Sequence, residues 1–233
     1  MHACRGHCYG TNTGRVYEKI RPVIKRNSTK TFEILAVILT GAGKILFFEV
    51  LHMQFWFIMM VSLFWLGYLV YVIGKNRERI THWGFRIKGL KESIRIILPL
   101  AVAALAIMLA YGITSGKALL SWHLLPSLLL YPLWGLAQQF IVLGMVAGNL
   151  QDLETFQMPK ILIILITAVL FCLVHYPNYP LVGATFLLSI IYCSVYLRYR
   201  NLWALGVIHG WLGTFFYYFV LGKDAWMTFI GSI

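Results

Sequence analysis

The sequence predicts an all-α protein, a polytopic bundle of about seven to eight membrane helices. Of the 233 residues, 60% are hydrophobic and only 12% are charged, whereas about a quarter of the residues in a soluble domain are charged. Apolar runs recur that are long enough to cross a bilayer core, which takes roughly 20 helical residues. The 20 lysines and arginines outnumber the 8 acidic residues and gather between these runs. Such clustering indicates membrane orientation and not nucleic-acid binding.

The first part of the chain, residues 1–31, is polar and basic and lacks the apolar core of a cleavable signal peptide. We therefore expect the first membrane helix to be retained as an anchor. Cysteines and histidines near the N-terminus could hold a metal ion, but one CxxxC motif lacks the second ligand pair of structural zinc. These residues are His2, Cys4, His7 and Cys8. Cys172 and Cys193 lie inside apolar runs, so we expect them to pack as small hydrophobic residues.

Seven runs are expected to cross the membrane: Phe32 to Glu49, Met53 to Ile73, Ile94 to Ile113, Ala118 to Leu150, Lys160 to Tyr176, Leu181 to Leu197 and Leu202 to Leu221. The fourth run exceeds the length of a simple crossing and contains Pro126 and Pro132. We expect these prolines to break it into a short lead segment and a spanning helix from about Leu133. Two crossings in this run are the alternative.

Charge also predicts the domain organisation and the orientation. With a cytoplasmic N-terminus, seven basic residues precede Thr31, another seven lie from Lys75 to Arg95, and the outside keeps only Lys117 and Lys223. This asymmetry follows the positive-inside rule and, without an organelle address, suggests a bacterial plasma membrane. The predicted parts are a basic N-terminal segment (1–31), N-terminal membrane helices with a basic cytoplasmic loop at 74–93 (32–113), a core that resembles a known family (118–221) and a C-terminal tail (222–233).

Polar residues at membrane depth are costly, so each is a candidate functional residue. They are Lys44, Glu49, His123, Gln138, Gln139, His175 and His209. Lys44 and Glu49 are expected simply to flank the outer end of the first helix. Phe171 and His175 share a helical face at i and i+4, and the glycines around His209 let another helix approach closely. Imidazoles suit acid/base chemistry or metal ligation near pH 7. A single histidine in such a run favours a hydrogen-bonded packing residue, but two of them with a Gln-Gln pair on a third helix favour a polar site within the bundle.

The order of these residues resembles that of the CPBP family, the CAAX-processing and bacteriocin-processing intramembrane endopeptidases. That family carries Glu-Glu-x-x-x-Arg-Gly, Phe-x-x-x-His and His-x-x-x-Asn or Asp on successive membrane helices. The matching positions here are Gln138-Gln139 with Gly144, Phe171 with His175, and His209 with Gly213. The resemblance covers roughly Leu133 to Val220, and the segment His82 to Arg86 is similar to the lead-in before that core.

The resemblance implies a peptidase acting on membrane-associated or lipidated peptide tails. It implies that Gln138, Gln139, His175 and His209 occupy the catalytic positions and that Phe171 and Gly213 contact substrate. In the family the first glutamate is thought to activate water, but an amide such as Gln138 cannot accept the proton.

Other polar positions of the family are also neutral here. Gln139 and Leu143 replace a glutamate and an arginine four residues apart, the spacing of a helical ion pair. Because both partners are missing together, no uncompensated charge is left inside the bundle. Gly213 replaces the assisting Asn or Asp. The expected helix ends also place His175 nearer the outer surface than Gln138 and His209.

Three functions follow as hypotheses. The first is a protease without the glutamate, with His175 or His209 as the base or as ligands of a divalent metal such as zinc. The second is a pseudoprotease that binds a tail as a chaperone, immunity factor or scaffold. The third is a transporter lined by the glutamines and histidines, which the absence of repeat symmetry disfavours. The expected partners are the lipid bilayer and a membrane-anchored or lipidated peptide, with no nucleic acid.

Overall fold

The computed structural model describes the backbone of residues 12–154 and 156–230, and the side chains of residues 27–154 and 156–227. All regular elements in these ranges are helical, which confirms the predicted fold class. Three of them, written η, are π-helices. The elements are α1 (Asn12–Ile45), η1 (Leu46–Val50), α2 (Gln54–Lys75), α3 (Glu78–Trp83), α4 (Leu90–Thr114), α5 (Leu124–Gln139), η2 (Phe140–Ala147), α6 (Gly148–Asp152), α7 (Lys160–Leu173), α8 (Tyr179–Tyr199), α9 (Leu202–Phe215), η3 (Phe216–Leu221) and α10 (Ala225–Ile230).

Six helices of the described chain are long and apolar enough to cross a membrane. They are Asn27–Val50, Gln54–Lys75, Leu90–Thr114, Leu124–Asp152, Tyr179–Tyr199 and Leu202–Leu221. Helix α7 is a seventh apolar helix, but its 14 residues fall short of that length. Each of the seven predicted runs thus contains an apolar helix, and the protein is an integral membrane protein.

The fourth run forms one continuous helix, so the predicted start near Leu133 is wrong. The helix begins at Leu124 and continues through η2 to Asp152. Pro126 lies in its first turn, where the missing N–H has no intrahelical partner to lose. Pro132 lies inside α5, where neighbouring helices of a membrane bundle can compensate for the disturbed backbone bonding.

Helices α5 and α9 form the closest contact of the bundle, and glycine makes it possible. A Cβ atom on Gly135 would lie 2.3 Å from the Gly206 carbonyl oxygen, and one on Gly210 would lie 2.4 Å from the Tyr131 carbonyl oxygen. No side chain fits at such distances, so the two backbones meet directly. The predicted close approach at the glycines around His209 is therefore confirmed, and α5 is the approaching helix.

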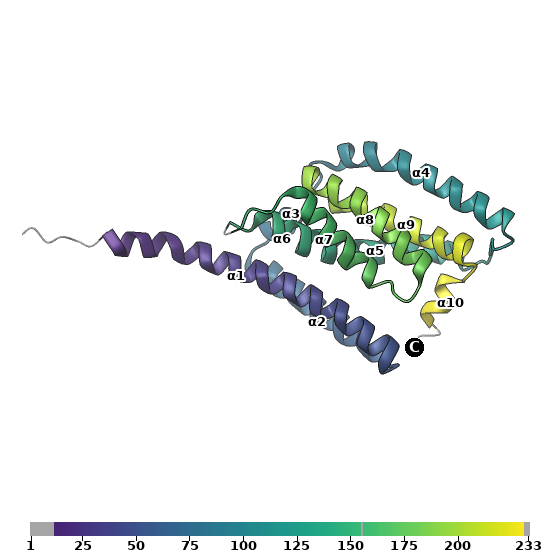
Figure 1. Ribbon diagram of the computed structural model, residues 1–233, viewed down its shortest axis with the longest axis horizontal. Coiled ribbons are helices and arrows are strands. Elements are labelled where there is room, and N and C mark those ends of the chain that lie inside the picture. Colours follow the sequence, from purple (N-terminus) through teal and green to yellow (C-terminus); the bar gives the residue numbers. More distant parts are fainter. Residues whose placement is uncertain (1–11, 155, 231–233) are drawn as a thin grey trace, which may run out of the picture.

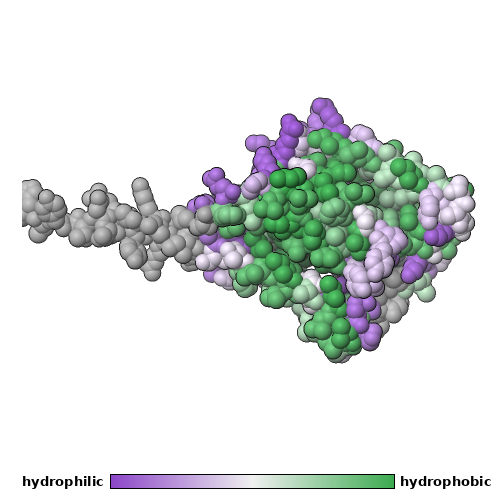
Figure 2. All heavy atoms as spheres, viewed as in Figure 1, coloured by the Kyte–Doolittle hydropathy of each residue, from purple (hydrophilic) through white to green (hydrophobic). Residues whose placement is uncertain are grey.

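The remaining helices surround this pair. Helix α7 packs on α8, and α4 flanks α9 and η3. Figure 1 shows α1 and α2 running side by side, with the N-terminal part of α1 extending beyond the bundle. Trp65 of α2 donates a hydrogen bond to the Thr40 hydroxyl of α1 at 3.3 Å. In Figure 2 the face in view is mostly hydrophobic, with hydrophilic residues gathered toward its margins, as expected of a surface that faces lipid.

The basic loops meet at one end of the bundle, which we call the basic end. There, Arg86 donates hydrogen bonds to the carbonyl oxygens of Arg200 and Tyr199 at 3.0 and 3.1 Å. Gly89 adopts a positive φ of 80° and packs where a Cβ would lie 2.5 Å from the Tyr199 carbonyl oxygen. The opposite end is closed by the 115–123 loop, in which the Leu119 N–H donates to the Tyr218 carbonyl oxygen at 2.9 Å.

Candidate functional site

The direct contact of α5 and α9 brings together Gln138 and His209. The Nε2 atom of His209 lies 3.0 Å from Oε1 of Gln138. Because the amide oxygen can only accept, Nε2 donates, and Nδ1 of a neutral imidazole is left as an acceptor. This Nδ1 is buried and has no hydrogen-bond partner among the described residues. His209 therefore holds an unused basic nitrogen inside the bundle.

Phe171 joins the two histidines. Its ring centroid lies 4.9 Å from that of His175 and 5.5 Å from that of His209, in both cases edge to face. The Nδ1 atom of His175 donates to the Phe171 carbonyl oxygen at 2.8 Å, so Nε2 is the unprotonated nitrogen of this imidazole when neutral. The predicted packing of Phe171 beside His175 is confirmed.

The shortness of α7 explains how His175 reaches this group. Its 14 residues rise about 21 Å, less than the roughly 30 Å of a bilayer core. A residue just past its end therefore lies deeper than one at the end of a full-length helix. His175 and His209, which were predicted to lie at different depths, both contact the ring of Phe171. We call Gln138, Phe171, His175 and His209 the histidine centre.

The other predicted site residues lie differently. Gln139 is buried and its Nε2 atom has no hydrogen-bond partner among the described residues. Leu143, at the position of the family's arginine, is fully buried within the π-helix η2. A Cβ atom on Gly213 would have the Tyr131 ring as its nearest neighbour, at 3.8 Å, so the structure leaves ordinary space there. Gly144 packs against the Phe140 ring.

A π-helix directly after Gln138 and Gln139 was not predicted from the sequence. Such i→i+5 segments are rare and frequently occur at functional sites. Here η2 also adds length to the long fourth apolar run without a break in the helix.

The described side chains offer few ligands for the metal ion considered in the sequence. Within residues 27–154 and 156–227, no group of three or more His, Cys, Asp or Glu residues is placed to hold a metal ion. Catalytic zinc takes three protein ligands, whereas the histidine centre offers the free nitrogens of His175 and His209. These residues do not fit a zinc site. The N-terminal candidates Cys4 and Cys8, with His2 and His7, lie outside the described residues.

Two hydroxyl groups on α8 were missed by the sequence reasoning. The Tyr192 ring lies 6.4 Å from the His209 ring, and its hydroxyl is buried without a partner among the described residues. Ser189, one helical turn earlier, has a buried and equally unpartnered hydroxyl. The sequence carried a signal, since Thr185, Ser189 and Tyr192 recur at helical spacing in an apolar run.

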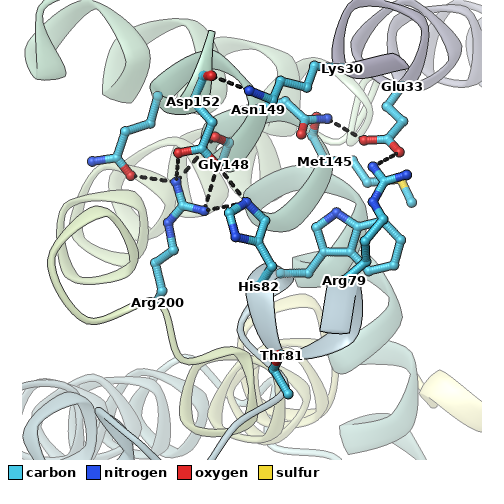
Figure 3. A network of polar contacts seen from close by, with 12 residues as sticks. Lys30, Glu33, Arg79, Thr81, His82, Met145, Gly148, Asn149, Asp152 and Arg200 are labelled. Carbon is cyan, nitrogen blue, oxygen red and sulfur yellow. Dashed lines mark hydrogen bonds and ion pairs between the residues drawn. The ribbon is translucent and has the colours of Figure 1, made fainter. Parts of the chain in front are cut away.

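A second polar cluster lies at the basic end, around a carboxylate that the sequence reasoning also missed. Glu33 of α1 has a fully buried side chain and accepts from Arg79 at 2.5 Å, from Asn149 at 2.6 Å, and from the Tyr68 hydroxyl. Figure 3 shows Glu33, Arg79 and Asn149 pointing toward one another from three separate elements. This cluster ties α1 to α3 and α6.

Asp152 forms the adjacent part of the same network. Both of its carboxylate oxygens accept from Arg200, at 2.6 and 2.8 Å, and His82 lies 2.8 Å from Oδ2 (Figure 3). Lys30 donates to the Asp152 backbone carbonyl oxygen. Arg200 adopts a positive φ of 45° at the end of α8, which aims its side chain into this cluster.

Of two further residues singled out in the sequence, His123 lies away from the histidine centre, whereas Lys44 lies beside it, bonded to the residue that follows His175. The Nδ1 atom of His123 and the Ser121 hydroxyl each lie 2.8 Å from Oδ2 of Asp224. These contacts connect the 115–123 loop to the C-terminal segment. Lys44 donates to the Tyr176 carbonyl oxygen at 2.6 Å and lies 3.8 Å from Glu49, as expected for residues at the end of the first helix.

Fold and site together define an integral membrane helix bundle with a polar, histidine-containing centre. Residues 120–215 match the family model described as type II CAAX prenyl endopeptidase Rce1-like, a range that contains the whole histidine centre. This match supports a CPBP/CAAX protease family for residues 120–215, in agreement with the predicted resemblance. Comparisons with curated proteins and with solved structures found no match.

Proposed function

We propose that the histidine centre binds a membrane-associated or lipidated peptide tail and that its capacity to hydrolyse peptide bonds is lost or strongly reduced. The observation that carries this proposal is the hydrogen bond between Gln138 and His209. An amide stands where the family has the carboxylate that activates water, and its carbonyl oxygen is engaged by an imidazole.

The binding function is supported by what the centre retains. Phe171, His175 and His209 match the family pattern and lie in ring contact with one another. Buried polar groups are costly in a membrane, so retaining them favours a ligand over simple packing. A scaffold, chaperone or immunity factor for a membrane-anchored protein would need such a site without turnover.

Residual hydrolysis is the second candidate. It is supported by the unpartnered Nδ1 atom of His209, which could accept a proton from water. His175 offers its Nε2 atom in the same way.

Cleavage of a peptide and prenyl-peptide library by the detergent-purified protein tests the two candidates. We expect the wild type to bind tails without cleaving them above background, and Gln138→Glu to restore measurable cleavage if the remaining centre is competent. Activity in the wild type that disappears with His209→Ala would overturn the loss of catalysis and establish a protease without the carboxylate. Absence of binding to every tail would overturn the binding function.

We further infer that the basic end faces the cytoplasm and that the N-terminus is cytoplasmic. The structure gathers the loop cations of 75–95 and Arg200 at one end, in agreement with the positive-inside rule. After replacement of the four native cysteines, a cysteine at exposed Lys88 or at exposed Lys117, on opposite ends, should label from opposite sides of intact cells. Labelling of Lys88→Cys from outside would reverse the orientation. The bacterial plasma membrane stays a prediction from the sequence.

A further inference from the structure

The hydroxyl groups of α8 differ in how they are satisfied. Thr185 and Ser194 each donate at 2.7 Å to the carbonyl oxygen four residues earlier, and Tyr196 donates at 2.7 Å to the Trp83 carbonyl oxygen. Ser189 and Tyr192 make no such bond. Serine in an apolar helix has this backbone partner within reach, so an unused hydroxyl is available for another acceptor or donor.

Tyr192 is the residue of α8 whose ring faces His209, at 6.4 Å between ring centroids, and Ser189 lies one helical turn before it. Ser189 and Tyr192 are three residues apart and therefore share a helical face. They are 3% and 1% exposed, and His209 is 7% exposed. Two hydroxyl oxygens, of Ser189 and Tyr192, and Nδ1 of His209 are thus buried without a hydrogen-bond partner among the described residues.

The chemistry of these three atoms favours a neutral ligand over a charged one. The three atoms without partners belong to neutral groups, and Ser189, Tyr192 and His209 form no ion pair among the described residues. A neutral polar ligand can satisfy these atoms without burying a charge beside them. Nδ1 of His209 is an acceptor, because Nε2 donates to Gln138. The hydroxyls can donate. A secondary amide presents the complementary pair, one N–H donor and one carbonyl acceptor.

We propose that Tyr192 and Ser189 form, with Nδ1 of His209, a subsite that holds one backbone amide of a bound tail. The amide N–H donates to Nδ1 of His209, and the amide carbonyl accepts from the Tyr192 hydroxyl, assisted by Ser189. The inference rests on the proposed binding function and adds α8 to the elements that make the site. Tyr192 is a binding residue in this arrangement and takes no part in proton transfer.

The test uses two matched probes, a farnesylated dipeptide methyl ester with one internal amide and its depsipeptide, in which an ester replaces that amide. Equilibrium binding to the full-length protein in detergent is measured for each. The wild type should bind the amide probe roughly tenfold more tightly, since the ester lacks the N–H. His209→Ala should abolish this preference. Tyr192→Phe should weaken both probes severalfold and keep the preference.

Tyr217→Phe, the same change at a tyrosine of η3 away from the histidine centre, serves as the matched control and should bind both probes like the wild type. Equal binding of both probes by the wild type, or unchanged binding by Tyr192→Phe, would overturn the subsite while leaving the binding function intact. Binding of neither probe by the wild type would overturn the proposed function and the subsite together. A Tyr192→Phe variant that matches the wild type in thermal stability excludes misfolding as the cause of weaker binding.

Discussion

The Glu33 carboxylate of α1 and the Asn149 amide of α6 are joined by a hydrogen bond of 2.6 Å inside the basic end of the bundle. The two residues are 116 positions apart in the chain. The same carboxylate accepts from Arg79, so one buried group holds three elements together. One buried side chain thus links α1 to both α3 and α6.

Glu33→Ala should therefore destabilise the protein by about 3 kcal/mol, the usual cost of breaking a buried ion pair from one side. Arg79 and Asn149 would lose their shared acceptor. Thermal unfolding in detergent measures the effect. Glu78→Ala removes an exposed carboxylate from the neighbouring α3 and should leave stability within about 0.5 kcal/mol of the wild type. Equal behaviour of the two variants would contradict the assigned role of Glu33.

Arg200→Lys should also destabilise the basic end, by about 1–2 kcal/mol, because a lysine cannot reproduce the two parallel bonds to Asp152. The charge is unchanged, so the geometry of the guanidinium is what is tested. Arg198→Lys, at an exposed position two residues earlier, is the matched control and should have no effect. If Arg198→Lys lost as much stability as Arg200→Lys, the bidentate contact with Asp152 would not be the cause of the loss.

Gly210→Ala should separate α5 from α9, because the new Cβ would lie 2.4 Å from the Tyr131 carbonyl oxygen. Overpacking of this kind costs about 1–3 kcal/mol. It should also weaken tail binding, since His209 and Gln138 are held by this contact. Gly183→Ala in α8 meets no atom within 4 Å and should stabilise the helix slightly. A folded Gly210→Ala variant with wild-type binding would refute the link between the glycine contact and the site.

The contact between Asp224 and the 115–123 loop should survive moderate acid. Burial raises the pKa of the Asp224 carboxyl, but hydrogen bonds from His123, Ser121 and Tyr218 outweigh it and hold the pKa below its ordinary value. A lowered folded pKa means that the stabilisation is present above the unfolded pKa of about 3.9 and is lost as the pH falls through the folded one.

Unfolding measured from pH 7 down to pH 2 checks this expectation. The difference in stability between the wild type and Asp224→Asn should be constant from pH 7 to about pH 5 and shrink below about pH 4. A difference that is already lost near pH 5 would show that the carboxyl has no lowered pKa.

Local properties of the chain were predictable from the sequence because they depend on neighbouring residues alone. The all-helical class follows from apolar runs that must satisfy their backbone groups internally. The contact of Phe171 with His175 follows from helical spacing, and the close approach near His209 follows from the absence of side chains on its glycines. The resemblance to the family was likewise readable from the order of Gln138, Phe171, His175, His209 and Gly213.

The unpredicted features all depend on which helices meet. Glu33 lies in the first apolar run, and nothing near it in sequence shows that Arg79 and Asn149 surround it. Pro132 predicts a helix break from the sequence, but it lies inside α5, where neighbouring helices can compensate for the disturbed turn. Ser189 and Tyr192 share a helical face by their spacing, but only the packing of α8 shows that this face meets His209. Helical periodicity shows which residues share one face of a helix. Which other helix that face contacts depends on packing between segments far apart in the chain.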